Sequence, residues 1–337
     1  MNTILVTGGL GFIGSHTVVE LQNAGYHVII IDNLYNSKME VLDQITEITG
    51  IKPSYLNIDL RNKEEVHAFF NNHPIDGIIH FAASKAVGES VKNPLLYYEN
   101  NIATLVYILQ EMKTHQIPNF IFSSSCTVYG QADELPITEN APVKPAESPY
   151  GNTKQIGEEI IEQSCHATHL KAIALRYFNP IGAHESVKIG ELPLGVPQNL
   201  IPYITQTAAG IRKELSVFGD DYPTPDGTAI RDYIHVVDLA KAHIAALERL
   251  IKGINKKEFE VFNIGTGKGS SVLEVIKTFE KVNQLHLSYK IVERRKGDIT
   301  AAYADTTLAN KELGWKAEKT LEEALHSAWR WQQKQQH

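Results

Sequence analysis

The sequence is poor in the features that mark secreted, membrane-spanning and nucleic-acid-binding proteins. Its 337 residues include only two cysteines, Cys126 and Cys165, too few for a disulfide framework, which favours a reducing compartment. It has 32 lysines and arginines against 39 aspartates and glutamates, and this acidic balance argues against a nucleic-acid-binding surface. No apolar run approaches the length of a transmembrane helix, and the N-terminus lacks the basic lead and long apolar stretch of a signal peptide. We therefore expect a soluble, cytoplasmic protein.

Motifs for metal-dependent and acyl-enzyme hydrolysis are missing as well. The 14 histidines are scattered and none forms an H-E-x-x-H motif, so we predict no metal site. His235 and His243 flank a predicted helix and are more simply structural. The absence of a G-x-S-x-G motif argues against a serine nucleophile.

The first half of the chain alternates short apolar runs with helical patterns. Several runs are nearly continuous in Val, Ile, Leu and Phe, as strands buried on both faces are. Strict strand–helix alternation predicts an α/β fold with a doubly wound parallel sheet of the Rossmann type. The predicted strands cover residues 3–8, 27–32, 53–59, 77–82, 119–125 and 171–178, and the predicted helices cover 12–24, 38–49, 62–72, 94–116 and 150–168.

The composition changes after about residue 179, and regular hydrophobic patterns become rarer. Residues 179–235 are rich in Pro, Gly and Asp, and helical patterns return only at 237–251, 271–282 and 320–335. We predict a Rossmann domain over residues 1–178 and a smaller mixed α/β substrate domain over 179–337, with elements near 236–265 able to pack back on the first. Ligands of doubly wound sheets bind at the carboxyl ends of the strands, so we expect the site between the two halves.

A glycine-rich stretch, TGGLGFIGSH, follows the first predicted strand and opens the first predicted helix. The spacing of Gly8, Gly11 and Gly14 lets the backbone approach a pyrophosphate, and the helix N-terminus supplies N–H donors and a positive dipole end. A tight structural turn is the plain alternative. Because the strand–turn–helix context is present, we predict a dinucleotide-binding loop.

Two aspartates end the next two predicted strands. Asp32 lies 18 residues past Gly14, where a carboxylate accepts hydrogen bonds from the ribose hydroxyls and repels a 2′-phosphate, which favours NAD over NADP. Asp59, with Leu60 beside it, could accept a hydrogen bond from the adenine amino group. Each has a structural alternative, since Asp32 could cap the following turn and Asp59 could be the N-cap of the helix starting near Arg61.

The stretch SPYGNTK places a tyrosine four residues before a lysine, so that Tyr150 and Lys154 share one face of a helix. A tyrosine acts as a base near neutral pH only if its pKa falls, and a nearby ammonium and a positive nicotinamide ring both favour the phenolate. Such a pair taken alone is mostly a surface feature. Downstream of a dinucleotide loop it predicts redox chemistry, with Lys154 also holding the nicotinamide ribose.

Three serines, Ser123 to Ser125, end the fifth predicted strand. A hydroxyl at the carboxyl end of a strand lies over the cofactor in this fold class. We choose Ser125 to bind the substrate oxygen beside Tyr150. The alternative is a serine-rich strand end whose hydroxyls bind backbone, and it applies to one or two of the three.

Seven ordered motifs together resemble those of the UDP-galactose 4-epimerases, which belong to the extended short-chain dehydrogenases/reductases. The resemblance runs from about residue 2 to the C-terminal helix, and this many motifs in order exclude chance. They are TGGLGFIG (7–14), FSSSCTVYG (122–130), YGNTK (150–154), RYFNPIGAH (176–184), DGTAIRDYIHVVDLA (226–240), FNIGTG (262–267) and RRKGD (294–298).

The resemblance implies an isomerase that keeps NAD bound through its cycle. Tyr150, as phenolate, takes the proton of the sugar 4-hydroxyl with help from Ser125, and hydride passes from sugar C4 to the nicotinamide. The 4-keto sugar then turns over in the site and receives the hydride on its other face. UDP-glucose and UDP-galactose are thereby interconverted, without water or a second substrate.

The resemblance also assigns individual binding residues. Arg231 and Arg295 have independent support, because a diphosphate favours guanidinium groups, although surface salt bridges are their plain alternative. Besides the glycines, Asp32, Asp59 and the Tyr150, Lys154 and Ser125 set, the implied NAD contacts are Phe12, Ile13, Asn33, Asn36, Ser37, Leu60, Phe81, Ala82, Lys85, Asn100 and Phe178. The implied UDP-sugar contacts are Lys85, Ser125, Tyr150, Asn179, Asn199, Leu200, Val217, Phe218, Arg231, Arg295, Asp298 and Ala302.

Ala302 stands where some members of the resembled family carry a tyrosine beside the sugar C2 substituent. Those members handle only UDP-glucose and UDP-galactose, whereas members with a small residue also admit N-acetyl sugars. We therefore expect activity on UDP-GlcNAc and UDP-GalNAc too.

The sequence has two alternative functional interpretations and one predicted assembly. A nucleotide-sugar 4,6-dehydratase would carry an acid pair just after Ser125, where this chain has Cys126 and Thr127. A non-catalytic NAD-binding sensor would typically lack the tyrosine that is present as Tyr150. The apolar stripe on helix 94–116 is read first as core, and the resemblance implies a homodimer through this helix and helix 150–168.

Overall fold

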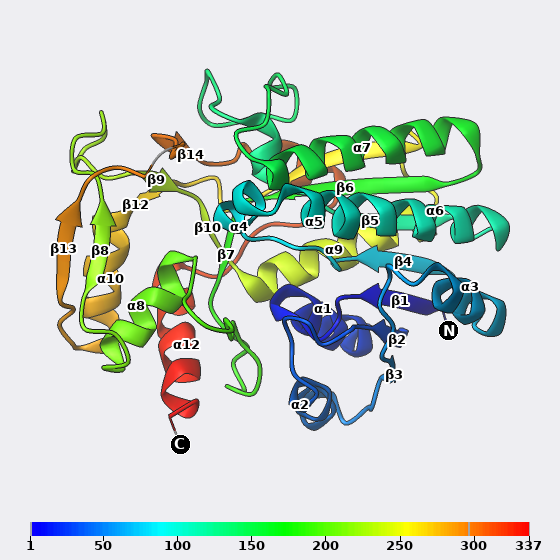
Figure 1. Ribbon diagram of the computed structural model, residues 1–337, viewed down its shortest axis with the longest axis horizontal. Helices are drawn as coiled ribbons and strands as arrows, with labels where there is room; N and C mark the ends of the chain where they lie inside the picture. Colours follow the sequence, from blue (N-terminus) through cyan, green and yellow to red (C-terminus); the bar gives the residue numbers. More distant parts are fainter. Residues whose placement is uncertain (1, 296, 337) are drawn as a thin grey trace.

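The computed structural model describes residues 2–295 and 297–336, and its centre is a seven-stranded parallel sheet (Figure 1). The strand order is β11-β6-β5-β4-β1-β2-β3, so the order reverses between β1 and β4, where doubly wound sheets bind their ligands. This confirms the predicted fold class. The strands are β1 (Thr3–Thr7), β2 (His27–Ile31), β3 (Ser54–Leu56), β4 (Gly77–His80), β5 (Asn119–Ser123), β6 (Lys171–Tyr177) and β11 (Phe259–Ile264).

Helices cover both faces of this sheet because its strands direct apolar side chains alternately to one face and to the other. In β1, Ile4 and Val6 join one buried cluster and Leu5 joins the other. The first cluster lies under α1 (Phe12–Asn23), α2 (Glu40–Thr49) and α9 (Val236–Ile251). The second lies under α3 (Lys63–Asn72), α6 (Thr104–Thr114) and α7 (Pro149–Ala167).

Two elements from the second half of the chain complete the sheet layer. Strand β11 pairs in parallel with β6, placing Phe262 opposite Leu175, and α9 packs against α1. The division of the chain into two domains stays a prediction.

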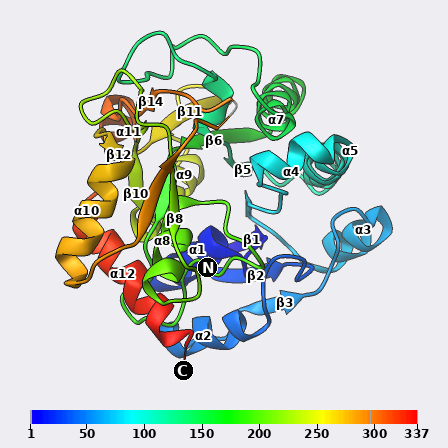
Figure 2. The same ribbon diagram turned by 60° about the vertical axis from the view of Figure 1, so that its left-hand side comes forward.

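Most of the remaining elements gather at one end of the sheet around a third core, whereas α11 contributes Ala309 to the first cluster and β14 contributes Ala302 to a small fourth one (Figures 1 and 2). Capping boxes begin two of the helices, with Ser271 and Glu274 at α10 and Thr320 and Glu323 at α12. These elements are β7 (Asn179–Ile181), α8 (Leu200–Ala208), β8 (Leu215–Phe218), β9 (Ile230–Arg231), β10 (Tyr233–His235), β12 (Ser270–Ser271), α10 (Val272–Asn283), β13 (Tyr289–Val292), β14 (Ala301–Ala302), α11 (Thr307–Glu312) and α12 (Leu321–Lys334).

The structure corrects some predicted elements. The predicted helix 94–116 is divided into α5 (Pro94–Tyr98), a π-helical turn at Glu99–Ala103 and α6, and a short α4 (Val87–Lys92) precedes it. The predicted strand 53–59 is paired only at β3, after which the chain leaves the sheet edge towards Asp59. None of the helices in the described part of the chain is long and apolar enough to cross a membrane.

Candidate active site

The glycine loop is packed so closely that side chains do not fit. A Cβ on Gly14 would lie 2.2 Å from the Gly8 carbonyl oxygen, and one on Gly8 would lie 2.9 Å from the Ala82 amide nitrogen. Gly8 also has a φ of 70°, which favours glycine. Gly11 caps α1 without a side-chain hydrogen bond, so first-turn N–H groups remain for an anionic ligand.

Asp32 connects this loop to the segment after β2. Its buried carboxylate accepts hydrogen bonds from the amides of Leu10 at 3.0 Å and Leu34 at 2.9 Å, and from the Ser37 hydroxyl at 2.7 Å. The turn-capping alternative is therefore observed. Ribose binding by the same carboxylate stays a prediction, and the group is well placed because its loop is already ordered.

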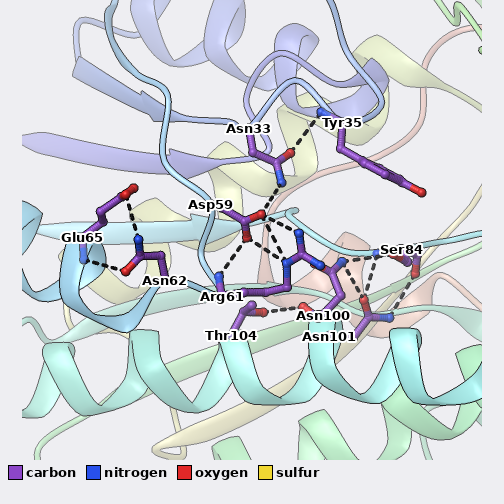
Figure 3. A network of polar contacts seen from close by, with 10 residues as sticks. All are labelled: Asn33, Tyr35, Asp59, Arg61, Asn62, Glu65, Ser84, Asn100, Asn101 and Thr104. Carbon is purple, nitrogen blue, oxygen red and sulfur yellow. Dashed lines mark hydrogen bonds and ion pairs between the residues drawn. The ribbon is translucent and has the colours of Figure 1, made fainter.

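Asp59 lies in a polar network at the end of β3 (Figure 3). It accepts hydrogen bonds from the Arg61 side chain at 2.7 Å and from Asn33 at 3.3 Å. The Arg61 guanidinium holds the pKa of Asp59 down at about 2, so the carboxylate is ionised. The alternative of Asp59 as an N-cap is wrong, because Asn62 caps α3 by accepting from the Glu65 amide.

Tyr150 and Lys154 lie in the first two turns of α7. Ser148 begins the helix by accepting a hydrogen bond from the Gly151 amide at 3.1 Å. Both side chains of the pair are buried, with the Lys154 Nζ 5.8 Å from the centroid of the Tyr150 ring. Lys154 donates to the Ser123 carbonyl at 2.7 Å, which ties α7 to the end of β5.

Burial dominates the protonation of this pair. It raises the pKa of the Tyr150 hydroxyl, with Tyr177 adding to the rise and the Ser125 hydroxyl opposing it. Burial lowers the pKa of Lys154 to about 8. The groups of the chain therefore keep Tyr150 protonated at neutral pH, and a further positive charge beside it is required for it to act as a base.

The three serines after β5 have separate partners. Ser123 hydrogen-bonds the Tyr177 hydroxyl at 2.6 Å, and Ser124 donates to Glu158 at 2.5 Å. Ser125 accepts only from the Thr127 amide, at 3.2 Å, among the side-chain contacts described. The Ser125 hydroxyl proton is not used in this contact, and the same hydroxyl opposes the rise in the pKa of Tyr150, so Ser125 faces that phenol as its predicted role requires.

Sequence reasoning missed two residues that hold α7 in place. The buried Asn101 accepts a hydrogen bond from the Ser84 amide at 2.8 Å and donates to the Ser84 carbonyl at 3.0 Å and to Thr153 at 3.1 Å. Thr153 in turn donates to the Tyr150 carbonyl at 2.7 Å. A π-helical turn carries Asn101, and such turns are common at functional sites, but no sequence pattern indicated this one.

A buried ion pair supports α7 from the sheet side. Arg176 on β6 donates to both carboxylate oxygens of Glu158, at 2.9 and 3.2 Å from its Nε, and to the Tyr129 hydroxyl at 3.0 Å. Glu158 follows Lys154 by one helical turn, so this pair sets the register of the catalytic face. It was not among the predicted residues.

The predicted sugar-binding residues meet at short strands beyond the sheet edge. Ala302 in β14 is buried and pairs with Arg231 in β9, which forms an ion pair with Asp298. Arg295 stacks on Phe218, with its guanidinium 4.0 Å from the ring centroid. Lys296 of the RRKGD motif lies outside the described residues.

Asp232 holds these strands together. Its buried carboxylate accepts hydrogen bonds from the Thr266 hydroxyl at 2.7 Å and from the Gly267 and Ala304 amides at 3.2 Å. Desolvation raises its pKa, which these donors oppose. It therefore links the end of β11 to the segment carrying Ala302.

Other predicted residues divide by the direction of their side chains. Lys85 and Asn199 both contact Glu191, at 3.6 and 2.8 Å, which joins the segment after β4 to the start of α8. Leu60 and Val217 are buried in apolar clusters, and their contacts with a ligand stay a prediction. The rest lie in the first turns of α1 and α8 (Phe12, Ile13 and Leu200), in the π-helical turn (Asn100), and at loops or strand ends (Asn36, Phe81, Phe178 and Asn179).

Comparisons with known proteins identify the family. Residues 5–328 match the family model described as GDP-mannose 4,6 dehydratase, a group of extended short-chain dehydrogenases/reductases. The chain is 49% identical to UDP-glucose 4-epimerase of Drosophila melanogaster, covering 98% of this chain and 96% of that one. It is 49% identical to the same enzyme of Haemophilus influenzae, covering 98% and 97%. The chain belongs to the UDP-glucose 4-epimerase family.

Solved structures agree with this membership. The epimerase of Bifidobacterium longum in complex with NAD+ and UDP has a TM-score of 0.94 and 49% identity, covering 99% of this chain and 98% of that one. The epimerase of Stenotrophomonas maltophila, with bound NAD and formylated UDP-arabinopyranose, has a TM-score of 0.96 and 45% identity, covering 100% and 99%.

Membership of the epimerase family weakens the dehydratase alternative, although the matching family model carries a dehydratase's description. Elimination of water needs an acid after Ser125, and the chain has Cys126 and Thr127 there. Burial raises the pKa of the Cys126 thiol to about 12, so it does not ionise. Cys126 instead packs in an apolar cluster with Phe178 and Ala302.

The residues present fit the NAD expected of an epimerase. The loop that tolerates no Cβ, the open N-terminus of α1 and the ordered carboxylate of Asp32 suit a pyrophosphate and a ribose. Tyr150 and Lys154 lie at the carboxyl ends of the central strands, where the nicotinamide is expected.

Proposed function

We propose that this protein interconverts UDP-glucose and UDP-galactose by reversible oxidation and reduction at sugar C4, with NAD held throughout. This proposal rests on the buried set of Tyr150, Lys154 and Ser125 in a chain that has a dinucleotide-type glycine loop and belongs to the epimerase family.

Each residue of the set has one task. Ser125 donates a hydrogen bond to the sugar 4-oxygen, and Tyr150 takes the 4-hydroxyl proton and later returns it. Lys154, held by the Ser123 carbonyl, keeps its ammonium close to the phenol ring. NAD supplies the hydride acceptor and a positive ring charge. That charge offsets the burial that otherwise raises the pKa of Tyr150.

The arginines at the sugar end bind the diphosphate in this proposal. Arg231 and Arg295 provide guanidinium forks from β9 and from the segment after β13, and Asp298 orients Arg231 through their ion pair. Because the sugar carries no strong charge, this anchoring leaves it free to present either face to the cofactor.

The test is an epimerase assay of the purified protein with UDP-glucose, UDP-galactose and their two N-acetyl counterparts, without added NAD. We expect turnover of the first pair, and NAD released on denaturation. Bound NAD without any turnover would favour the non-catalytic sensor, and formation of a 4-keto-6-deoxy sugar would favour a dehydratase.

We further propose that the enzyme accepts N-acetyl sugars. Ala302 is buried beside Cys126 and Phe178, and its methyl group takes far less volume than the tyrosine that some members of the family carry at this position. No measurable turnover of UDP-GlcNAc or UDP-GalNAc in the same assay would overturn this.

A homodimer, a cytoplasmic location and a two-domain organisation complete the proposal. Leu95 on α5 is 81% exposed and offers an apolar side chain near the predicted interface. The buried faces of α6 and α7 pack in the core. Light scattering that gives the mass of one chain would refute the dimer.

The cytoplasmic location is supported by two cysteines that form no disulfide. We retain residues 1–178 for NAD and 179–337 for the UDP-sugar, with β11 and α9 returning to the first domain.

A further inference from the structure

Tyr35 is an aromatic side chain with no part in the chemistry described above. It follows β2 directly after Asp32 and Asn33, and 69% of its surface is exposed. Single exposed apolar residues are common and need no explanation by themselves. Tyr35 differs because the backbone of its loop is ordered by the side chains of Asp32 and Asn33.

Two hydrogen bonds order the backbone around Tyr35. Asp32 accepts from the Leu34 amide at 2.9 Å, and Asn33 accepts from the Tyr35 amide at 3.1 Å. Leu34 has a φ of 58°, a left-handed conformation that is unfavourable for a branched side chain. The chain therefore accepts local strain to present the next residue, Tyr35, outward.

The same loop is tied to the end of the neighbouring strand. Asn33 donates to Asp59, and Asp59 holds the Arg61 guanidinium (Figure 3). Figure 3 shows the Tyr35 ring extending from this loop on the side of Ser84 and Asn100, above the Arg61 side chain.

The surroundings of the ring match one kind of ligand. Asp32 is predicted to bind a ribose and Asp59 an exocyclic amino group, and both lie at the strand ends on the β2 and β3 side of the sheet. An exposed aromatic ring above such groups offers a stacking surface to a purine base. We infer that Tyr35 covers the adenosine end of bound NAD and slows its release.

This inference rests on the proposed NAD site, and its test separates the two. Wild-type protein and three variants are purified with their cofactor: Tyr35→Ala, Tyr35→Phe, and Tyr289→Ala as a matched exposed tyrosine on β13. The measurement is the rate at which bound NAD exchanges for isotope-labelled NAD, read by mass spectrometry, together with the affinity for UDP.

We expect Tyr35→Ala to exchange NAD about 10-fold faster than wild type. Tyr35→Phe and Tyr289→Ala should stay within about twofold of it, because base stacking needs the ring and not the hydroxyl. UDP affinity should not change in any variant.

The outcomes distinguish the two proposals. A wild-type protein that carries and binds no NAD would overturn the proposed function. Normal NAD exchange in Tyr35→Ala would overturn only the role of Tyr35. Faster exchange in Tyr35→Phe to the same degree, or a parallel loss of UDP affinity, would also overturn it, because the ring would then not be a local cover.

Discussion

The dinucleotide end of the site is positioned mainly by backbone, whereas the sugar end is positioned mainly by side chains. Around Gly8 and Gly14, close approach of loops excludes even a methyl group. Around Arg231 and Ala302, strands of two residues are held by the Asp232 carboxylate and by ion pairs. We call the NAD end backbone-built and the sugar end side-chain-built. A backbone-built site tolerates few substitutions, whereas a side-chain-built site can change specificity when a single residue changes.

The catalytic pair lies where the two ends meet, and its loss should have the largest effect. Tyr150→Phe removes the proton acceptor but leaves the ring that fills the same space. We expect turnover to fall by about 10²–10⁴-fold, with NAD content and UDP affinity unchanged. Steady-state rates and the NAD released on denaturation measure this. Wild-type turnover would show that another group takes the proton.

The second test breaks the backbone-built end. A Cβ at position 14 would meet the Gly8 carbonyl oxygen at 2.2 Å, so Gly14→Ala must shift the loop. We expect purified Gly14→Ala to retain little NAD and to lose about 1–3 kcal/mol of unfolding free energy. Denaturant titration and NAD release measure the two effects.

Gly88→Ala is the matched control for the loop variant. It also lies in a helix, and its Cβ would meet nothing closer than 4.0 Å. Alanine is favoured over glycine in helices by about 1 kcal/mol, so this change should be neutral or stabilising. Equal NAD loss in both variants would contradict the role of close packing.

The third test changes the side-chain-built end. Ala302→Tyr should lower kcat/KM for the N-acetyl pair by at least about 10-fold and leave the UDP-glucose and UDP-galactose pair nearly unchanged. Ala302→Ser, which adds one oxygen, should keep both activities. Equal losses on the two sugar pairs would contradict a specificity role for this position.

The fourth and smallest effect concerns pH. Burial lowers the pKa of His16 and His80 to about 3, and that of His235 and His243 to about 4. The unfolded chain therefore binds more protons than the folded protein below pH 6.5. Stability is complete above that pH and falls as pH decreases towards the folded pKa values.

Replacement of one such histidine tests this linkage. The Nε2 of His243 is buried without a partner, and its ring lies 4.7 Å from that of Phe81, so His243→Phe suits the site. We expect its unfolding free energy to fall less steeply below pH 6.5, by up to about 1.4 kcal/mol per pH unit. Parallel curves for wild type and variant would contradict the proposed titration.

Sequence patterns predicted the two ends unequally. Long apolar strands and regular helices gave the sheet, the glycine loop and the start of α7, because burial on both faces leaves a strong periodic signal. The segment after residue 179 contains β9 and β14, each of two residues, which are too short to show any period. Its site residues were predicted from the resemblance, with independent chemical support only for Arg231 and Arg295.

Groups that act through other residues escaped the sequence for a related reason. Asn101 and Thr153 are 52 positions apart, which is too far for a sequence motif to connect them. Only folding brings their side chains to 3.1 Å from each other. The Glu158 and Arg176 pair is similar, since each residue alone is an ordinary surface type.

The sequence by itself determined six strands of the parallel sheet, the glycine loop and the position of Tyr150 and Lys154 on one helix face, because each shows as a local pattern in the chain; the seventh strand, β11, was not predicted. The tertiary structure decided how α7 is held against β5 and β6, which side chains surround Ala302, and where the Tyr35 ring lies. These depend on contacts between distant segments, and such contacts exist only once the core has packed.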